Sequence, residues 1–104
     1  MISTRAQQIL TPLLEKCDEV SSLFRSLAHP VRLKILCQVM ETEKAVNELT
    51  DFCEISQSSM SQFLTRMKDE GILALRKHGR FAYYRIKDPS AKKLIKALCN
   101  IYRT

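Results

Sequence analysis

Apolar residues recur every three or four positions along most of this 104-residue chain, and this spacing predicts a mainly helical protein. A first amphipathic helix is expected to begin at Thr11-Pro12, with proline at its first helical position, and to run to about Ala28. A short helix is expected over residues 31–40. Residues 1–10 are only weakly periodic, so we expect them to be frayed or to form a short helix.

The stretch Ser56–Gly71 predicts one helix with a start signal and a stop signal, because Ser56 can cap the first turn and Gly71 can adopt the left-handed conformation that ends a helix. Its apolar residues fall on one face: Met60, Phe63, Leu64 and Met67. The opposite face carries short, uncharged hydrogen-bonding side chains: Gln57, Ser58, Ser61, Gln62 and Thr65. Residues 45–53, capped near Asn47, predict another short helix just before it. Glu54-Ile55 would form a tight turn between the two, so the pair predicts a helix-turn-helix.

After Gly71 the apolar period changes from helical to alternating, which predicts a β-hairpin. Its strands are expected over residues 72–77 and 81–86, and its tip over 78–80, where Gly79 suits a positive φ. A basic hairpin after a helix-turn-helix is typical of a DNA-binding wing, although an ordinary solvated hairpin has the same pattern. Asp88-Pro89 then predicts the start of a last helix, ending near Tyr102.

These elements predict one domain over residues 1–104, mainly α with a β-hairpin wing, and hence a winged helix-turn-helix fold. The first and last helices have more apolar face than a core of this size requires. We therefore expect a homodimer formed through these two helices, which would also suit a palindromic DNA operator. The alternative is that both helices cover the core of their own chain.

The net charge of +6 is distributed unevenly. Residues 1–55 carry six Lys/Arg and eight Asp/Glu, whereas residues 56–104 carry eleven and three, so the half with the polar helix is strongly basic. This asymmetry favours a polyanionic partner. No apolar run approaches a membrane span and no secretory signal is present, so we expect a cytoplasmic protein without a membrane partner. The chain lacks paired carboxylates, a nucleophile with its base, and a Gly-rich phosphate loop, so we expect neither an enzyme nor a cofactor.

The partner that fits these features is double-stranded DNA. Glutamine can pair in bidentate fashion with adenine, and serine can bond several base edges in the major groove. We therefore expect base contacts from Gln57, Ser58, Ser61 and Gln62. We call the helix predicted over residues 56–71 the reading helix. Phosphate contacts are expected from four cations in this helix and in the wing: Arg66, Arg76, Lys77 and Arg80. A dimeric interaction module with an incidentally basic surface is the alternative from a different class of protein.

The four cysteines lie at positions 17, 37, 53 and 99, and none forms a Cys-x-x-Cys pair. Structural disulfides are uncommon in the cytoplasm, so each cysteine by itself is expected to be a small buried hydrophobe. The spacing indicates no metal site.

Several segments of the chain together resemble the ArsR/SmtB repressors, over roughly residues 20–102. They are LAHPVRLKIL (27–36), VNEL (46–49), SQSSMSQFL (56–64), EGIL (70–73) and GRFAYYRI (79–86). The resemblance implies a homodimeric winged helix-turn-helix repressor that leaves its operator when an inducer binds or reacts. Phe63 stands where the family often has histidine, so we assign no base contact there.

The resemblance also bears on the inducer. Two positions that hold a Cys-x-Cys metal site in some members are Ala45 and Asn47 here, and residues 89–104 contain no Asp, Glu or His. The Ile-Leu-Cys sequence ending at Cys37 is similar to the sulfide- and persulfide-responsive branch. The second cysteine of that branch would fall at Arg103, and Cys99 lies one helical turn earlier.

The resemblance therefore implies release by thiol oxidation or persulfide chemistry at Cys37 with Cys99, which requires their Cα atoms to approach within about 7 Å. Cys17 and Cys53 are alternative partners. A metal or metalloid bound by thiolates, or a repressor without sulfur-based sensing, remain the other interpretations.

Overall fold

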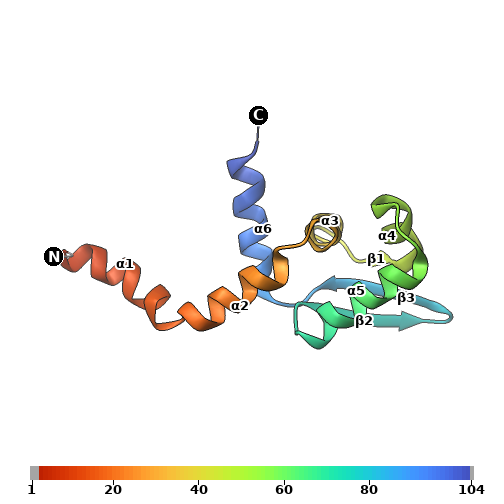
Figure 1. Cartoon of the computed structure of the whole chain (residues 1–104), viewed down its shortest axis with the longest axis horizontal. Coiled ribbons are helices and arrows are strands. Elements are labelled where there is room, and N and C mark those ends of the chain that lie inside the picture. Colours follow the sequence, from red (N-terminus) through yellow and green to blue (C-terminus); the bar gives the residue numbers. More distant parts are fainter. Residues whose placement is uncertain (1–2, 104) are drawn as a thin grey trace.

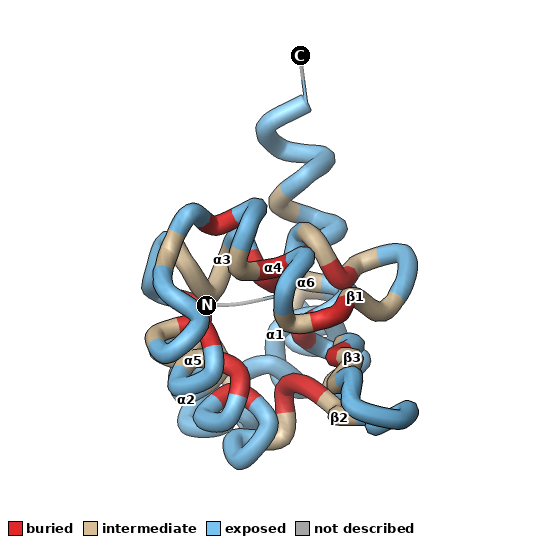
Figure 2. The backbone as a smooth tube through the Cα atoms, turned by 90° about the vertical axis from the view of Figure 1, so that its right-hand side faces the viewer, coloured by how far each residue is buried: buried red, intermediate tan, exposed pale blue. Residues whose placement is uncertain are grey.

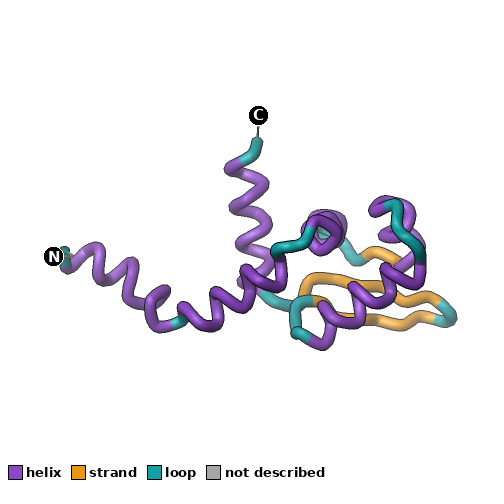
Figure 3. Tube along the Cα trace, viewed as in Figure 1, coloured by secondary structure: helices purple, strands orange, loops and turns teal. Residues whose placement is uncertain are grey.

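The computed structural model describes residues 3–103 of the chain, so the first two residues of the weakly periodic segment 1–10 lie outside the described part. Figures 1 and 3 show a small body made of helices and one antiparallel hairpin, with an N-terminal arm and a C-terminal helix projecting from it. In chain order the elements are α1 (Thr4–Glu15), α2 (Cys17–Leu27), α3 (Pro30–Gln38), β1 (Lys44–Ala45), α4 (Val46–Cys53), α5 (Gln57–Asp69), β2 (Leu73–His78), β3 (Phe81–Ile86) and α6 (Pro89–Ile101).

The N-terminal arm differs from the prediction. Thr11-Pro12 does not start a helix: α1 begins at Thr4, where the Ser3 hydroxyl oxygen accepts a hydrogen bond from the Ala6 N–H (3.2 Å), and Pro12 lies inside the helix. The single predicted helix is also interrupted, since the Lys16 N–H bonds the Leu13 carbonyl three residues back (3.0 Å) and α2 starts afterwards. The prediction was wrong because Pro12 was taken as a start signal, while a serine nine residues earlier supplies the cap.

The apolar stripe predicted for this first helical segment is not buried in the single chain. No residue of α1 is buried, and in α2 only Leu27 is. Leu14 and Phe24, two members of the stripe, are 61% and 54% exposed. Helix α1 is therefore not held by packing against the body of its own chain, whereas the end of α2 reaches the core through Leu23 and Leu27.

The core lies between α3, α4, α5, the start of α6 and one face of the sheet, as the buried segments in Figure 2 show. Its fully buried side chains come from α3, α4, α5, β2 and α6: Ile35, Leu36, Leu49, Met60, Leu64, Met67, Leu73 and Ile95 are under 2% exposed. The predicted short helices are confirmed. However, α4 is not capped by Asn47: Ala45 occupies the N-cap position, and its backbone N–H donates to Glu48 Oε1 (3.3 Å). Asn47 lies within the first turn.

The predicted hairpin is confirmed, with two differences. The first strand runs one residue later than expected, and the turn contains only Gly79 (φ +60°) and Arg80. A third strand, β1, was not predicted, and its second residue, Ala45, was placed in the helix expected over residues 45–53. Strand β1 pairs with β3, with Lys44 opposite Tyr84. A two-residue strand has no periodicity to detect, and its pairing depends on a partner 40 positions away.

The last helix is confirmed: the Asp88 carboxylate accepts a hydrogen bond from the Ser90 N–H (2.8 Å) and Pro89 is the first helical residue. Its first turns reach the core through Ala91 and Ile95, whereas Ile101 and Tyr102 at its other end are 69% and 80% exposed.

The radius of gyration of the described chain is 16.1 Å and its longest dimension is 56 Å. A compact chain of this length would have a radius of about 13 Å. Both ends of the chain therefore extend beyond the body that they flank.

Candidate nucleic-acid interface

The helix that carries the predicted base contacts is fixed at both ends by its own sequence. The Ser59 N–H donates to Ser56 Oγ (3.0 Å) at the start of α5. At the other end the Gly71 N–H bonds the Lys68 carbonyl and the Ile72 N–H bonds the Met67 carbonyl (3.0 Å each), while Gly71 has a φ of +83°. These bonds form a Schellman motif, which stops the helix at the predicted glycine.

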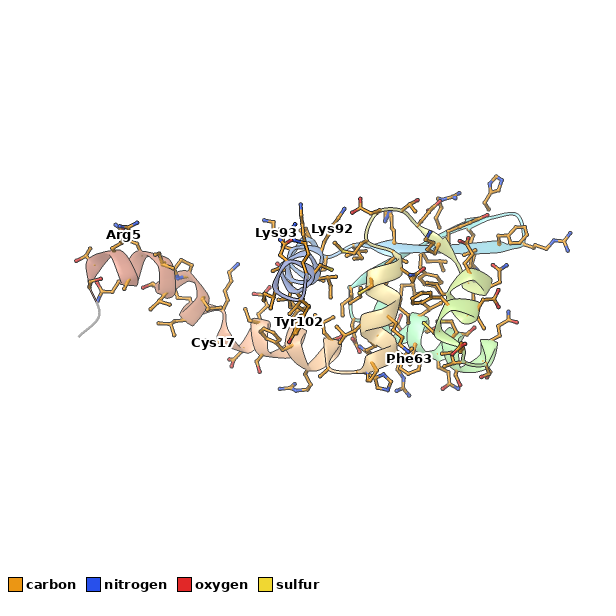
Figure 4. The ribbon with its side chains drawn as sticks, turned by 90° about the horizontal axis from the view of Figure 1, so that it is seen from above. Arg5, Cys17, Phe63, Lys92, Lys93 and Tyr102 are labelled. Atoms are coloured by element: carbon orange, nitrogen blue, oxygen red, sulfur yellow. The ribbon has the colours of Figure 1, made fainter. Side chains whose placement is uncertain are left out.

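Burial of one face of α5 turns the opposite face to solvent. Met60, Leu64 and Met67 are completely buried, as the spacing predicted, and Phe63 is half-buried against the ring of His29, with 4.8 Å between the ring centroids. Phe63 therefore packs against the start of α3. The labelled Phe63 in Figure 4 lies beside that helix.

The four predicted base-contact residues lie together on the solvent face: Gln57, Ser58, Ser61 and Gln62 are all exposed. Among residues 3–103 their side chains make no hydrogen bond to another side chain or to the backbone, so their donors and acceptors face solvent. Arg66 is exposed one turn further along and, with Thr65, borders a shallow hollow of about 420 Å³ over the same face.

The turn before α5 completes a helix-turn-helix. Glu54, which ends α4, has a left-handed conformation (φ 55°), and the half-buried Ile55 leads into the Ser56 cap. Helix α4 packs directly against α5. This arrangement confirms the tight turn expected at Glu54-Ile55.

The three predicted cations of the wing are exposed but not equivalent. Strand register pairs Arg76 with Tyr83 and Lys77 with Ala82, so the two side chains project from opposite faces of the hairpin. The Arg76 guanidinium is already engaged: its Nε donates to both Glu43 carboxylate oxygens (3.1 Å each), and its Cζ lies 4.7 Å from the centre of the Tyr83 ring. In the described part of the chain, Lys77 and Arg80 make no ion pair.

Glu43 is the residue that sequence reasoning missed in this region. The hydrogen bond from Arg76 is the main reason that the pKa of its carboxyl lies below the usual range. Glu43 and Arg76 are 33 positions apart, and no local pattern joins them.

The basic half of the chain extends beyond α5 and the wing to the last helix. Lys92 and Lys93 project from α6, and in Figure 4 they lie on the other side of the molecule from Phe63 of α5. The Lys and Arg residues of positions 56–104 are therefore distributed over α5, the wing and the last helix.

The cysteines differ from the expectation that each is buried. Only Cys53 is buried; Cys17, Cys37 and Cys99 are exposed, and all four thiols are free. Cys17 lies at the junction of α1 and α2 (Figure 4), and its Sγ donates to the Leu13 carbonyl oxygen (3.5 Å).

Cys37 and Cys99 come from two helices that pack together, α3 and α6. Partial burial raises the pKa of the Cys37 thiol, and the neighbouring Cys99 raises it further. Between residues 3 and 103, no three His, Cys, Asp or Glu side chains gather in a way that could hold a metal ion. The described helices include none with the length and apolar character needed to cross a bilayer.

Comparison with known proteins agrees with this geometry. Residues 29–74, from the start of α3 into β2, match the family described as bacterial regulatory protein, arsR family. The chain is 32% identical to the biofilm growth-associated repressor of Xylella fastidiosa strain 9a5c over 99 residues, which are 95% of this chain and 87% of that protein. It is 32% identical to the transcriptional activator HlyU of Vibrio cholerae over 80 residues, or 77% and 74% of the two chains.

A solved structure is similar as well. The crystal structure of the transcriptional repressor BigR from Xylella fastidiosa superposes with a TM-score of 0.83 at 32% sequence identity, covering 90% of this chain and 96% of that one. Helix-turn-helix, wing and flanking helices thus agree in sequence and in arrangement, and the chain belongs to the ArsR family of bacterial regulatory proteins, with the winged helix-turn-helix fold.

Proposed function

We propose that this chain is a transcriptional repressor that binds a palindromic DNA operator as a homodimer. The observation that carries the proposal is the solvent face of α5, where uncharged hydrogen-bonding side chains have no partner in the described residues. Such a face suits the donor and acceptor pattern of the major groove. Repression is also the activity in the name of the Xylella relative, while the Vibrio relative is named an activator.

We assign base contacts and phosphate contacts to different parts of this surface. The base contacts are Gln57, Ser58, Ser61 and Gln62. The phosphate contacts are Arg66, Arg76, Lys77 and Arg80. Arg76 would have to exchange Glu43 for a phosphate, so we expect a smaller contribution from it than from Arg80.

Dimerisation through the first and last helices is supported by their unburied apolar residues. Ile9, Leu13 and Leu14 of α1 are 50–69% exposed. At the end of α6, Ile101 is 69% exposed and Tyr102 is 80% exposed. Large apolar side chains gathered on projecting helices are typical of a surface that a partner covers. A two-fold dimer would present two copies of α5 to successive major grooves.

The DNA-binding proposal is tested with a duplex selected by the wild-type protein from a random library. Gln62→Ala should change sequence preference, since one bidentate base contact discriminates by about 1–3 kcal/mol. Arg80→Ala should weaken binding to every duplex and flatten the dependence on salt by about one charge. If Gln62→Ala lowers the affinity for the selected duplex and for random duplexes by the same factor, the assignment of Gln62 as a base contact is refuted. Transcription from a promoter that contains the selected site should fall when protein is added, and a rise would refute repression.

We further propose that thiol chemistry at Cys37 with Cys99 releases the DNA. The packing of α3 on α6 and the effect of Cys99 on the pKa of Cys37 support this pairing. Oxidation by peroxide would join the two sulfurs while the oxidant is reduced to water. An organic persulfide would yield the same link together with a thiol and hydrogen sulfide. A link between α3 and α6 would shift the body that carries α5 relative to the last helix.

Intact mass and peptide mapping after each oxidant test the switch, with DNA binding followed on the same samples. We expect a loss of two hydrogens, a Cys37–Cys99 peptide, and release from the selected duplex. Cys37→Ser and Cys99→Ser should abolish both effects, and Cys17→Ser, which changes another exposed cysteine, should keep them. Undiminished DNA binding by the oxidised protein would refute the switch, and release by a thiophilic metal without a mass change of two hydrogens would favour a metal-responsive repressor.

A further inference from the structure

Three side chains from three segments of the chain meet at the C-terminal end of α5. Arg32 of α3 binds Glu70 at two points, from Nη1 to Oε1 (2.7 Å) and from Nη2 to Oε2 (3.1 Å). The same Nη1 donates to the backbone oxygen and the hydroxyl of Ser26 in α2 (3.0 and 2.7 Å), and the Ser26 hydroxyl also donates to Glu70. The Arg32 side chain is only 12% exposed, whereas the Glu70 side chain is 42% exposed, so the guanidinium lies inward and the carboxylate lies at the surface.

This cluster spans a place where the helices themselves do not pack closely. Between α2 and α5 lies an open groove of about 980 Å³, with Leu23 and Arg25 on one side and Gln62 and Phe63 on the other. Within residues 3–103, the bond from Ser26 to Glu70 is the hydrogen bond that joins α2 to α5. Glu70 is the residue that ends α5, and its own N–H bonds the Arg66 carbonyl. The cluster therefore connects the end of the reading helix to the projecting arm.

A small rotation of α5 matters on the scale of DNA. A helix of 13 residues is about 20 Å long, so a tilt of about 10° moves one end by about 3 Å. This displacement is close to the rise of one base step, about 3.4 Å. The start of α5 is tied to α4 by the helix-turn-helix turn, and its far end is tied by the Schellman bonds and by Arg32.

We propose that Arg32 is a positioning residue for operator recognition: through Glu70 and Ser26 it sets the orientation of α5 relative to α2, and so the spacing between the two reading helices of a dimer. The inference rests on the proposed function and extends it, because it names what determines half-site spacing. The pKa of the Glu70 carboxyl lies below its usual range, chiefly because of the hydrogen bond from Arg32, so Glu70 is ionised and paired at neutral pH.

The test measures how strongly each protein discriminates half-site spacing. Wild-type protein first selects its duplex from a random library, and one or two base pairs are then inserted or deleted between the half-sites. Arg32→Lys keeps the charge but removes the two-point contact, and Glu70→Gln keeps the shape but removes the charge. Glu41→Gln removes another exposed carboxylate, outside the cluster, and serves as the matched control.

We expect the wild type and Glu41→Gln to lose at least tenfold in affinity per inserted base pair. Arg32→Lys and Glu70→Gln should both bind the selected duplex several-fold more weakly than the wild type. For both variants the spacing penalty, which is the factor by which affinity falls when the half-site spacing is altered, should be at least threefold smaller. A loss of folded protein alone would lower all affinities by one factor and leave that penalty unchanged.

Two outcomes separate this inference from the function on which it rests. An unchanged spacing penalty in both cluster variants, with far-UV circular dichroism and dimer mass like those of the wild type, would overturn the role of Arg32 and leave the repressor proposal intact. If the wild type enriches no duplex sequence, both proposals are overturned.

Discussion

Shortening one exposed leucine of the arm should weaken the dimer without unfolding the body. Leu14 of α1 is 61% exposed in the single chain. Leu14→Ala removes about three methylene equivalents, each worth about 0.8 kcal/mol when buried. If a partner covers the fraction that is now exposed, the loss is about 1.5 kcal/mol per copy and about 3 kcal/mol per dimer. The dimer dissociation constant should therefore rise by about 100-fold.

Sedimentation equilibrium over a range of concentrations measures this change directly. Gln8→Ala alters an exposed polar residue of the same helix and should leave the dissociation constant within about twofold. Because no residue of α1 is buried in the body, far-UV circular dichroism of Leu14→Ala should stay close to that of the wild type. An unchanged dissociation constant for Leu14→Ala would show that α1 lies outside the dimer interface, and would refute the reasoning from its exposed apolar face.

Three further results are expected from the local contacts. Ser56→Ala removes the cap of α5 and should lower the free energy of unfolding by about 1 kcal/mol in urea. The depressed pKa of Glu70 means that its pairing with Arg32 stabilises the fold above pH 4.5 and is lost as the pH falls below that value, so Glu70→Gln should flatten the loss of stability in this acidic range. Alkylation of Cys37 should reach half its maximal rate above pH 9.0, and Cys99→Ser should lower that midpoint because Cys99 contributes to the raised pKa.

Each of these has a result that contradicts it. The cap argument fails if Ser56→Ala unfolds at the same urea concentration as the wild type, and Ser61→Ala on the solvent face of the same helix is its control. Equal acid sensitivity of wild type and Glu70→Gln would mean that other carboxyls dominate acid unfolding. An alkylation midpoint that does not move in Cys99→Ser would mean that the two thiols do not interact.

Much of the helix-turn-helix and the wing was predictable, because the residues that determine them lie close together in the chain. The serine cap and the glycine stop of α5 lie within 16 positions, and the three- and four-residue spacing of Met60, Leu64 and Met67 decides which face is buried. The hairpin follows from alternation around Gly79. The face that remains exposed was therefore identifiable from the sequence.

The arm was predicted less well because several signals competed. Pro12 suits a first helical turn, and Ser3 suits a cap, and local preference does not decide between them. The apolar stripe indicated burial, but periodicity does not say whether the covering surface belongs to the same chain. The exposure of Leu14 and Phe24 shows that the body of the single chain does not provide it.

The sequence by itself determined the order of the helices and the hairpin from α3 to α6, without β1, together with the buried face and the polar face of α5, since these depend on residues a few positions apart. Only the tertiary structure decided that Arg76 is held by Glu43, that Arg32 joins Ser26 to Glu70, and that Cys37 and Cys99 lie on adjacent helices. The residues of these pairs lie up to 62 positions apart in the chain. Their formation depends on how the helices pack around a shared core, and no spacing along the chain encodes that packing.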